Sequence, residues 1–152
     1  MIRPRWTAVT FDAGGTLIDV AEPVGVVYAR TAARLGIVRS PVAVEAAFRS
    51  AMAAAPPLAF PGLAAAALTD AERGWWRAVV HASLGTPPPD ERFEACVDTL
   101  MAHDAHATAW RLFPEVADVL VALRRTGIRR AVVSNFDRRL VPILEGIGLA
   151  PL

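Results

Sequence analysis

An aspartate near the N-terminus stands where an apolar run of the β type meets a glycine-rich turn. Asp12 follows the run at residues 6–11, and Gly14, Gly15 and Thr16 come soon after it. A carboxylate can attack phosphorus or an activated carbon and form a covalent ester. Glycines let the backbone approach a ligand closely, and free N–H groups in such a turn suit a phosphate or another anion. The pattern predicts a nucleophile beside an anion-binding turn, with a turn-capping acid as the alternative.

A second apolar run ends in polar residues far downstream. Residues 130–134 are typical of a strand, and Ser134 and Asn135 could supply a hydroxyl, an amide and backbone N–H groups to an anionic oxygen. The alternative is a polar strand end that leads into a helix capped by Asp137. A helix before this strand implies parallel pairing, and open α/β sheets bind ligands at the carboxyl ends of their strands. We therefore expect Asp12 and Ser134 at the same edge of a sheet.

The elements that must position these residues follow from the pattern of apolar residues and caps. We expect strands at 6–11 and 130–134 and helices at 23–35, 41–54, 69–84, from Asp90 onward, 114–126 and from Asp137 onward. The helix from 69 is predicted by a capping box, Thr69 to Glu72. In the helix after Asp90, one face carries Phe93, Cys96, Val97, Leu100 and Met101. The chain therefore divides into an α/β core, residues 1–20 and 107–152, and a four-helix insert, residues 21–106.

Composition excludes several classes of function. The 152 residues are 54% hydrophobic with a net charge of +1, so no strong field favours nucleic acid or an anionic membrane. The lone Cys96 cannot form an internal disulfide and fits a reducing, cytoplasmic location. Residues 51–69 carry no charge, but prolines and a glycine interrupt them, so a membrane span is not expected.

The two polar strand ends resemble the first two motifs of the haloacid dehalogenase (HAD) superfamily of hydrolases. That family has Asp-x-x-Gly-Thr at the end of its first strand and Ser or Thr at the end of its second. The matching residues are Asp12, Gly15, Thr16 and Ser134. The resemblance implies a Rossmann-like parallel core with an inserted helical cap, an aspartate nucleophile, and Ser134 and Asn135 as ligands of the transferred group.

Three further segments are similar to the rhythmically-expressed-gene-like subfamily of that family. They are residues 55–62, 72–76 and 134–137. The resemblance covers essentially the whole chain. The family resemblance implies a small phosphorylated or otherwise anionic substrate. It also implies a Mg²⁺ cofactor, held by the Asp12 carboxylate and the Gly14 carbonyl.

Two departures from the family pattern bear on activity. Phosphatases of the family carry a second aspartate, a general acid, where this chain has Gly14. The family's lysine and its later Mg²⁺-binding acids follow the second motif and one more strand, and this chain contains no lysine and ends at Leu152. We therefore expect a phosphatase-type hydrolase that is inactive as a 152-residue chain and associates through exposed sheet edges. The alternatives are a dehalogenase- or phosphonatase-type enzyme, and a binding module without catalysis.

Overall fold

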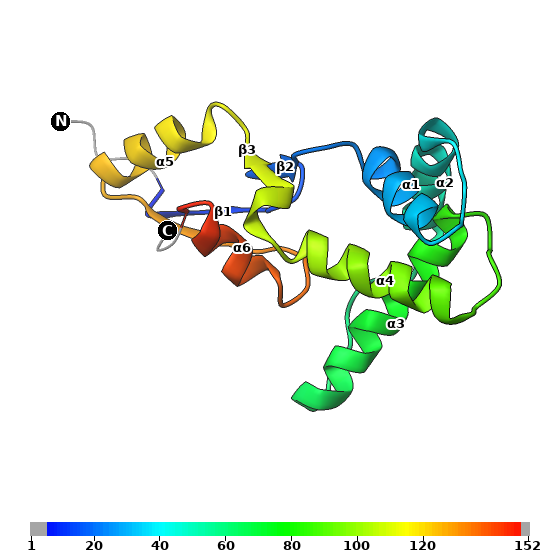
Figure 1. The fold of residues 1–152 in the computed structure, drawn as a ribbon. Helices are drawn as coiled ribbons and strands as arrows, with labels where there is room; N and C mark the ends of the chain where they lie inside the picture. Colours follow the sequence, from blue (N-terminus) through cyan, green and yellow to red (C-terminus); the bar gives the residue numbers. More distant parts are fainter. Residues whose placement is uncertain (1–5, 150–152) are drawn as a thin grey trace. The chain divides into compact units, whose positions relative to one another are not determined.

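The computed structural model describes residues 6–149 and contains two compact units (Figure 1). One unit is formed by the chain up to Ala21 together with the chain from His106 onward, and the other by Glu22–Ala105. The first contains both strands that precede the polar motifs, and the second is entirely helical. The chain is therefore an α/β protein with a helical insert between its two core strands.

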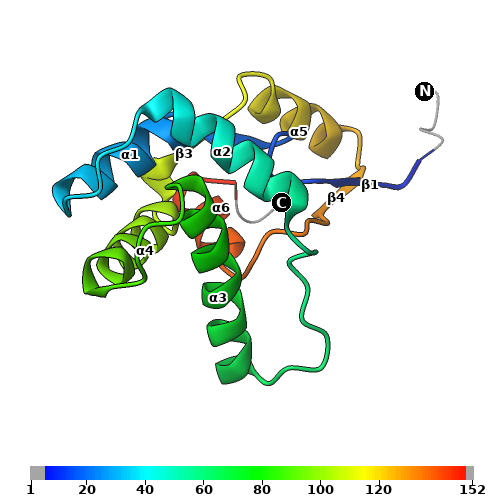
Figure 2. The same ribbon diagram turned by 90° about the vertical axis from the view of Figure 1, so that its right-hand side faces the viewer.

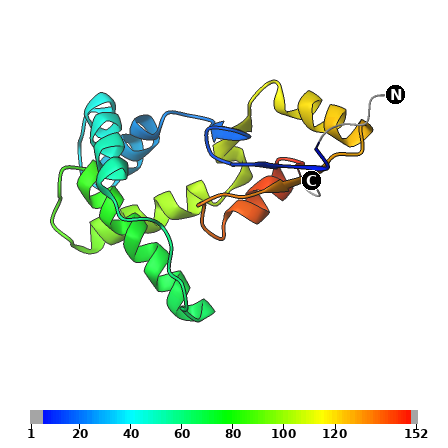
Figure 3. The same cartoon turned by 180° about the vertical axis from the view of Figure 1, so that it is seen from behind.

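A parallel pair of strands forms the centre of the α/β unit (Figure 3). Strand β1 (Ala8–Phe11) pairs with β4 (Arg129–Val132), with Phe11 opposite Val132. The pairing predicted from sequence is confirmed, although both strands are shorter than expected. Within the described residues each of these strands has one strand neighbour. Self-association through the remaining edges stays a prediction.

A second, antiparallel pair lies in the same unit and was not expected from the sequence. Strand β2 (Ile18–Val20) pairs with β3 (Trp110–Leu112), which follows a short 3-10 helix, η1 (Ala107–Ala109). Helices α5 (Val116–Arg125) and α6 (Leu140–Gly146) complete the unit. Their apolar faces and the β2 strand share one core, formed by Leu17, Ile18, Val116, Leu120, Ile143, Leu144 and Leu149.

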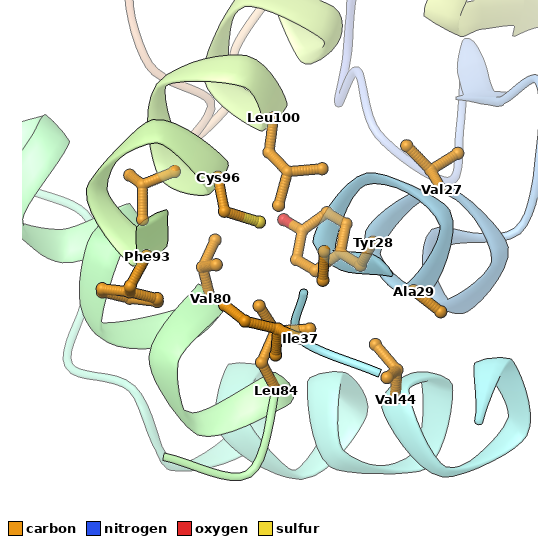
Figure 4. Packing of buried hydrophobic residues seen from close by; sticks show 12 residues of the cluster. Val27, Tyr28, Ala29, Ile37, Val44, Val80, Leu84, Phe93, Cys96 and Leu100 are labelled. Atoms are coloured by element: carbon orange, nitrogen blue, oxygen red, sulfur yellow. The ribbon is translucent and has the colours of Figure 1, made fainter. Parts of the chain in front are cut away.

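The helical unit has four helices around a separate core. They are α1 (Val24–Arg34), α2 (Pro41–Ala54), α3 (Ala65–Ser83) and α4 (Glu91–Asp104). Figure 4 shows the side chains of this core, in which Tyr28 and Val80 lie beside Cys96 and Leu84 lies beside Ile37. The predicted apolar face of α4 is confirmed, because four of its five residues are fully buried and Met101 packs against them.

Helix α3 begins earlier than predicted. It starts at Ala65, and its first turns project beyond the other helices of the unit (Figure 2). The predicted capping box does not form. The Thr69 hydroxyl donates to the Ala65 carbonyl one turn earlier (3.1 Å), and Glu72 is buried. Four alanines precede Leu68, three of them within the helix, and alanine has the highest helix propensity, which explains the extension.

A glycine allows helices α1 and α2 to pack at close range. A Cβ at Gly25 would overlap the Pro41 carbonyl oxygen and lie 2.7 Å from the Glu45 Cβ. The Gly25 N–H also donates to Glu45 Oε2 (2.7 Å), so the two helices cannot separate without losing this bond.

Replacing Gly25 with alanine is expected to lower the free energy of unfolding by about 1–3 kcal/mol, since overpacked sites relax at that cost. Gly74 is the matched control: it lies in the exposed interior of α3, and a Cβ added there would have no atom within 4 Å. Gly74→Ala is expected to raise stability by about 0.5–1 kcal/mol. Urea unfolding followed by circular dichroism checks both, and equal effects of the two substitutions would contradict the packing argument.

No helix in residues 6–149 combines the length and the apolar character needed to cross a membrane.

Candidate functional site

Asp12 lies at the carboxyl end of β1, as predicted. It follows Phe11 directly and its side chain is exposed. One carboxylate oxygen, Oδ1, accepts the N–H of Ala13 at 2.7 Å. The contact fixes the side chain at the start of the turn, while the residue remains open to solvent. A carboxylate held in this way is available to attack a substrate.

The turn after Asp12 uses more of its own N–H groups than the sequence suggested. The Ala13 carbonyl accepts the N–H groups of Thr16 (3.2 Å), Leu17 (2.8 Å) and Ile18 (3.0 Å). The Gly15 N–H donates to the Ile18 carbonyl at 2.9 Å. The expectation of a turn with free N–H groups was therefore wrong for Gly15 and Thr16. The Gly14 N–H is not among these bonds.

Gly15 has a backbone reason to be glycine. Its φ is +73°, in the left-handed region that other residues rarely adopt. The Thr16 side chain is exposed, and no hydrogen bond from its hydroxyl to Asp12 is found within the described chain. The structure thus explains Gly15 through the shape of the turn, and it leaves the binding roles of Gly14, Gly15 and Thr16 as proposals.

Ser134 and Asn135 lie in the loop after β4 rather than at the end of the strand. The strand ends at Val132, two residues before Ser134. The Ser134 hydroxyl oxygen accepts the N–H of Phe136 at 3.3 Å, and Asn135 is exposed. The hydroxyl hydrogen can still be donated to an anionic oxygen, because a hydroxyl both donates and accepts.

One hydrogen bond connects the two strand ends. The Val133 N–H donates to the Phe11 carbonyl at 2.9 Å, which extends the pairing of β1 and β4 by one step. Asp12 follows the acceptor and Ser134 follows the donor, so the two predicted residues leave the sheet from neighbouring strands at the same edge. A carboxylate, a hydroxyl and an amide on two chain segments that leave neighbouring strands at this edge could attack and hold an anionic group.

The metal ligands implied by the resemblance are only partly present. Asp12 offers a carboxylate and Gly14 a backbone carbonyl, whereas residues 6–149 contain no group of three His, Cys, Asp or Glu side chains placed to hold a metal ion. Mg²⁺ takes octahedral oxygen ligands and is usually held by one or two carboxylates, with waters and substrate phosphate. The described residues supply too few ligands for a protein-built Mg²⁺ site.

Space does not explain the missing general acid at Gly14. A Cβ at this position would have no atom within 4 Å, and the φ of Gly14 is not positive. An aspartate side chain could therefore be accommodated two residues after Asp12. Glycine at this position therefore lacks the acidic group although there is room for it.

Two histidines have structural partners. His106 Nδ1 lies 2.9 Å from Thr108 Oγ1, and His81 Nε2 lies 2.9 Å from the Pro87 carbonyl. Cys96 is fully buried in the helical unit, and this burial raises its pKa to about 11. The thiol therefore stays protonated at neutral pH and is a core residue, as the sequence suggested.

A buried ion pair that begins three residues after Ser134 was not predicted from the sequence. Asp137 was predicted to cap a helix, but α6 begins only at Leu140, and the Asp137 carboxylate binds the Arg139 guanidinium, with Oδ2 and Nη2 2.6 Å apart. The Asp-x-Arg spacing is visible in the sequence. Its burial could not be read there, because it depends on how the loop packs.

Comparison with known proteins identifies the family of this chain. The family model for "haloacid dehalogenase-like hydrolase" matches residues 6–151. Two curated relatives are both called haloacid dehalogenase-like hydrolase domain-containing protein 3. The mouse protein is 36% identical over 97% of this chain and 59% of its own length, and the human protein is 34% identical over 93% and 56%. The chain thus spans little more than half the length of these relatives.

A solved structure agrees in fold. The crystal structure of a HAD family hydrolase from Deinococcus radiodurans R1, with bound phosphate and sodium, matches 95% of this chain and 54% of its own with a TM-score of 0.55. At 22% sequence identity this match supports the fold alone. Because the family model covers nearly the whole chain, this chain belongs to the haloacid dehalogenase-like hydrolases.

Proposed function

We propose that this chain carries the nucleophile and the anion-binding loops of a phosphatase-type hydrolase, with Asp12 as nucleophile and Ser134 and Asn135 as ligands of the phosphoryl oxygens. The observation that carries the proposal is the Val133–Phe11 hydrogen bond, which places the residues after β1 and β4 at one sheet edge. The phosphate in the Deinococcus structure is consistent with a small anionic substrate. Gly14, Gly15 and Thr16 form the turn beside the reacting group.

The proposed reaction has two displacements. An oxygen of the Asp12 carboxylate attacks phosphorus, the bond to the ester oxygen breaks, and that oxygen takes a proton from water. Water then attacks the phosphoryl group, which releases phosphate and restores the carboxylate. Ser134 and Asn135 donate hydrogen bonds to the phosphoryl oxygens, where negative charge must be stabilised.

Mg²⁺ is proposed as the cofactor of this reaction. The Asp12 carboxylate and the Gly14 carbonyl would bind it, and the ion would neutralise charge on the phosphoryl group. Because the described residues supply too few ligands, no step of the reaction is assigned to the ion. A cytoplasmic location and membership of the rhythmically-expressed-gene-like subfamily are further proposals, which rest on the single cysteine and on the insert segments.

Gly14 favours a second candidate function. An acid at this position would protonate an alkoxide leaving group, which is typically worth about 10²- to 10⁴-fold in rate. A halide leaves without a proton and would suffer less from a glycine there. A dehalogenase- or phosphonatase-type reaction at Asp12 is therefore the alternative, and a binding module that holds an anion without turnover is the third.

The 152-residue chain is expected to show negligible Mg²⁺-dependent phosphatase activity. It contains no lysine to balance the charge of the phosphoryl group, and the Asp137 carboxylate near the other strand end is already engaged by Arg139. A panel of phosphate monoesters, assayed with and without Mg²⁺, checks this. Robust turnover that disappears in Asp12→Asn would contradict it while supporting the nucleophile.

Trapping the intermediate tests the proposed function itself. A form of the protein with turnover, quenched in acid during the reaction and digested, should yield a phosphorylated peptide that contains Asp12. The Asp19→Asn variant is a matched control, since Asp19 lies in the same unit but is paired with Arg111 (3.0 Å). An adduct on any other peptide would overturn the assignment of Asp12.

A further inference from the structure

The loop that carries Ser134 and Asn135 is anchored at both of its ends. At the first end, Val133 is bonded to Phe11 across the strand pair. In the middle, the Phe136 N–H donates to Ser134 Oγ, and the Phe136 ring meets Trp110 edge-on with centroids 5.2 Å apart. The position of the Ser134 hydroxyl therefore depends on where the rest of the loop is held.

The second anchor is a buried ion pair between Asp137 and Arg139. The guanidinium donates from Nη2 to Oδ2 (2.6 Å) and from Nε to Oδ1 (2.9 Å), and the Arg139 backbone N–H also donates to Oδ1 (3.0 Å). Only 2% of the Asp137 side chain and 13% of the Arg139 side chain are exposed. The carboxylate is thus fixed in one orientation by three donors from one residue.

Stability alone does not account for this arrangement. Burying two charges costs desolvation free energy that their attraction often fails to recover, and apolar residues can replace such pairs without loss. Helix capping does not require burial either. At the start of α4 the same Asp-x-Arg spacing occurs in Asp90 and Arg92, where the side chains are 37% and 63% exposed and Asp90 caps the helix through the Phe93 N–H (3.0 Å).

We propose that Asp137 and Arg139 are positioning residues, whose ion pair holds the turn from Ser134 to Phe136 in the shape that receives the anionic group of the substrate. Only three residues separate the Val133 anchor from Asp137, so fixing Asp137 leaves this short segment few alternative paths. Neither side chain touches the substrate in this arrangement; both act through Ser134 and Asn135. The inference rests on the proposed function and deepens it by naming what keeps the anion-binding loop in place.

Hydrogen–deuterium exchange of the whole chain, read by mass spectrometry and titrated with inorganic phosphate, tests this. In the native protein, phosphate should slow exchange in peptides covering 12–18 and 133–139. In Arg139→Gln, exchange at 133–139 should be faster without phosphate. The phosphate concentration for half-maximal protection should rise about tenfold, as expected for loss of one well-placed hydrogen bond to a charged group. Exchange at 8–11 should stay unchanged, which shows that β1 is intact.

Two further variants make the result specific. Arg139→Lys keeps the charge and one contact, so it should recover part of the phosphate protection, and it carries the test if Arg139→Gln does not fold. Arg92→Gln, which breaks the exposed pair of the same spacing, should leave both the loop and the phosphate titration unchanged. If phosphate protects the loop of Arg139→Gln at the same half-maximal concentration as in the native protein, the positioning role is overturned and the proposed function stands. Absence of phosphate protection in the native chain would overturn the proposed function, and with it the claim that the turn is held for an anion.

Discussion

Replacing Asp12 with asparagine is expected to lower kcat/KM for a phosphate ester by about 10⁴- to 10⁶-fold, the range seen when a nucleophile is removed from an enzyme. Asparagine keeps the size of the side chain and an oxygen that can still accept the Ala13 N–H, so the turn should keep its shape. It lacks the anionic oxygen that forms the ester. The loss should therefore appear in kcat, with little change in the binding of inorganic phosphate.

Steady-state kinetics of both forms, in a form of the protein with turnover, checks this expectation. Asp19→Asn serves as the control, because it removes a carboxylate of the same unit that is already engaged by Arg111 in the pairing of β2 with β3. We expect that variant to keep activity within a fewfold of the native enzyme. Full activity in Asp12→Asn would remove Asp12 from the mechanism and would favour a site elsewhere.

The position of Asp12 could be predicted because it depends on local sequence. An apolar run that ends in an acid and then glycines marks a strand end, and the parallel pairing of two such runs brings their ends together. The hydrogen bonding of the turn was not predictable in the same way. The Ala13 carbonyl accepts three N–H groups because the chain turns tightly into β2, and the sequence did not reveal this strand.

The missed strands share one physical cause. Strands β2 and β3 have three residues each and pair across a gap of about ninety residues in the sequence, with Asp19 opposite Arg111. Three residues are too few to show an alternating pattern, so only the partner reveals the strand. The buried pair of Asp137 and Arg139 was missed for a related reason: residue types suggest an ion pair, whereas burial is a property of the folded loop.

The helical unit was the most predictable part, and α4 shows why. Its start at Asp90 follows from a capping residue, which accepts the Phe93 N–H in the structure, and its buried face follows from the spacing of five apolar residues. Both signals are local. The predicted start of α3 was wrong because two local signals competed. The high helix propensity of the alanines before Thr69 outweighed the capping box.

Truncating Phe93 to alanine is expected to lower the free energy of unfolding of the helical unit by about 3–5 kcal/mol, the usual cost of emptying an aromatic site in a core. Phe93 is fully buried, its ring meets His81 edge-on (5.2 Å between centroids), and the Arg77 guanidinium lies 5.2 Å from its centre. The substitution therefore removes core packing and a cation–π contact together. Typical domains have only about 5–15 kcal/mol of stability, so a large share would be lost.

Calorimetry of the whole chain measures this loss, and Phe60→Ala provides a matched control. Phe60 is half-buried in the loop before α3 and lies outside the core of the helical unit, so the same truncation there should cost clearly less. Because the chain forms two compact units, the effect of Phe93→Ala should fall on one transition and leave the α/β unit folded. Equal shifts in both variants, or a joint loss of both units, would show that Phe93 does not anchor a separate helical core.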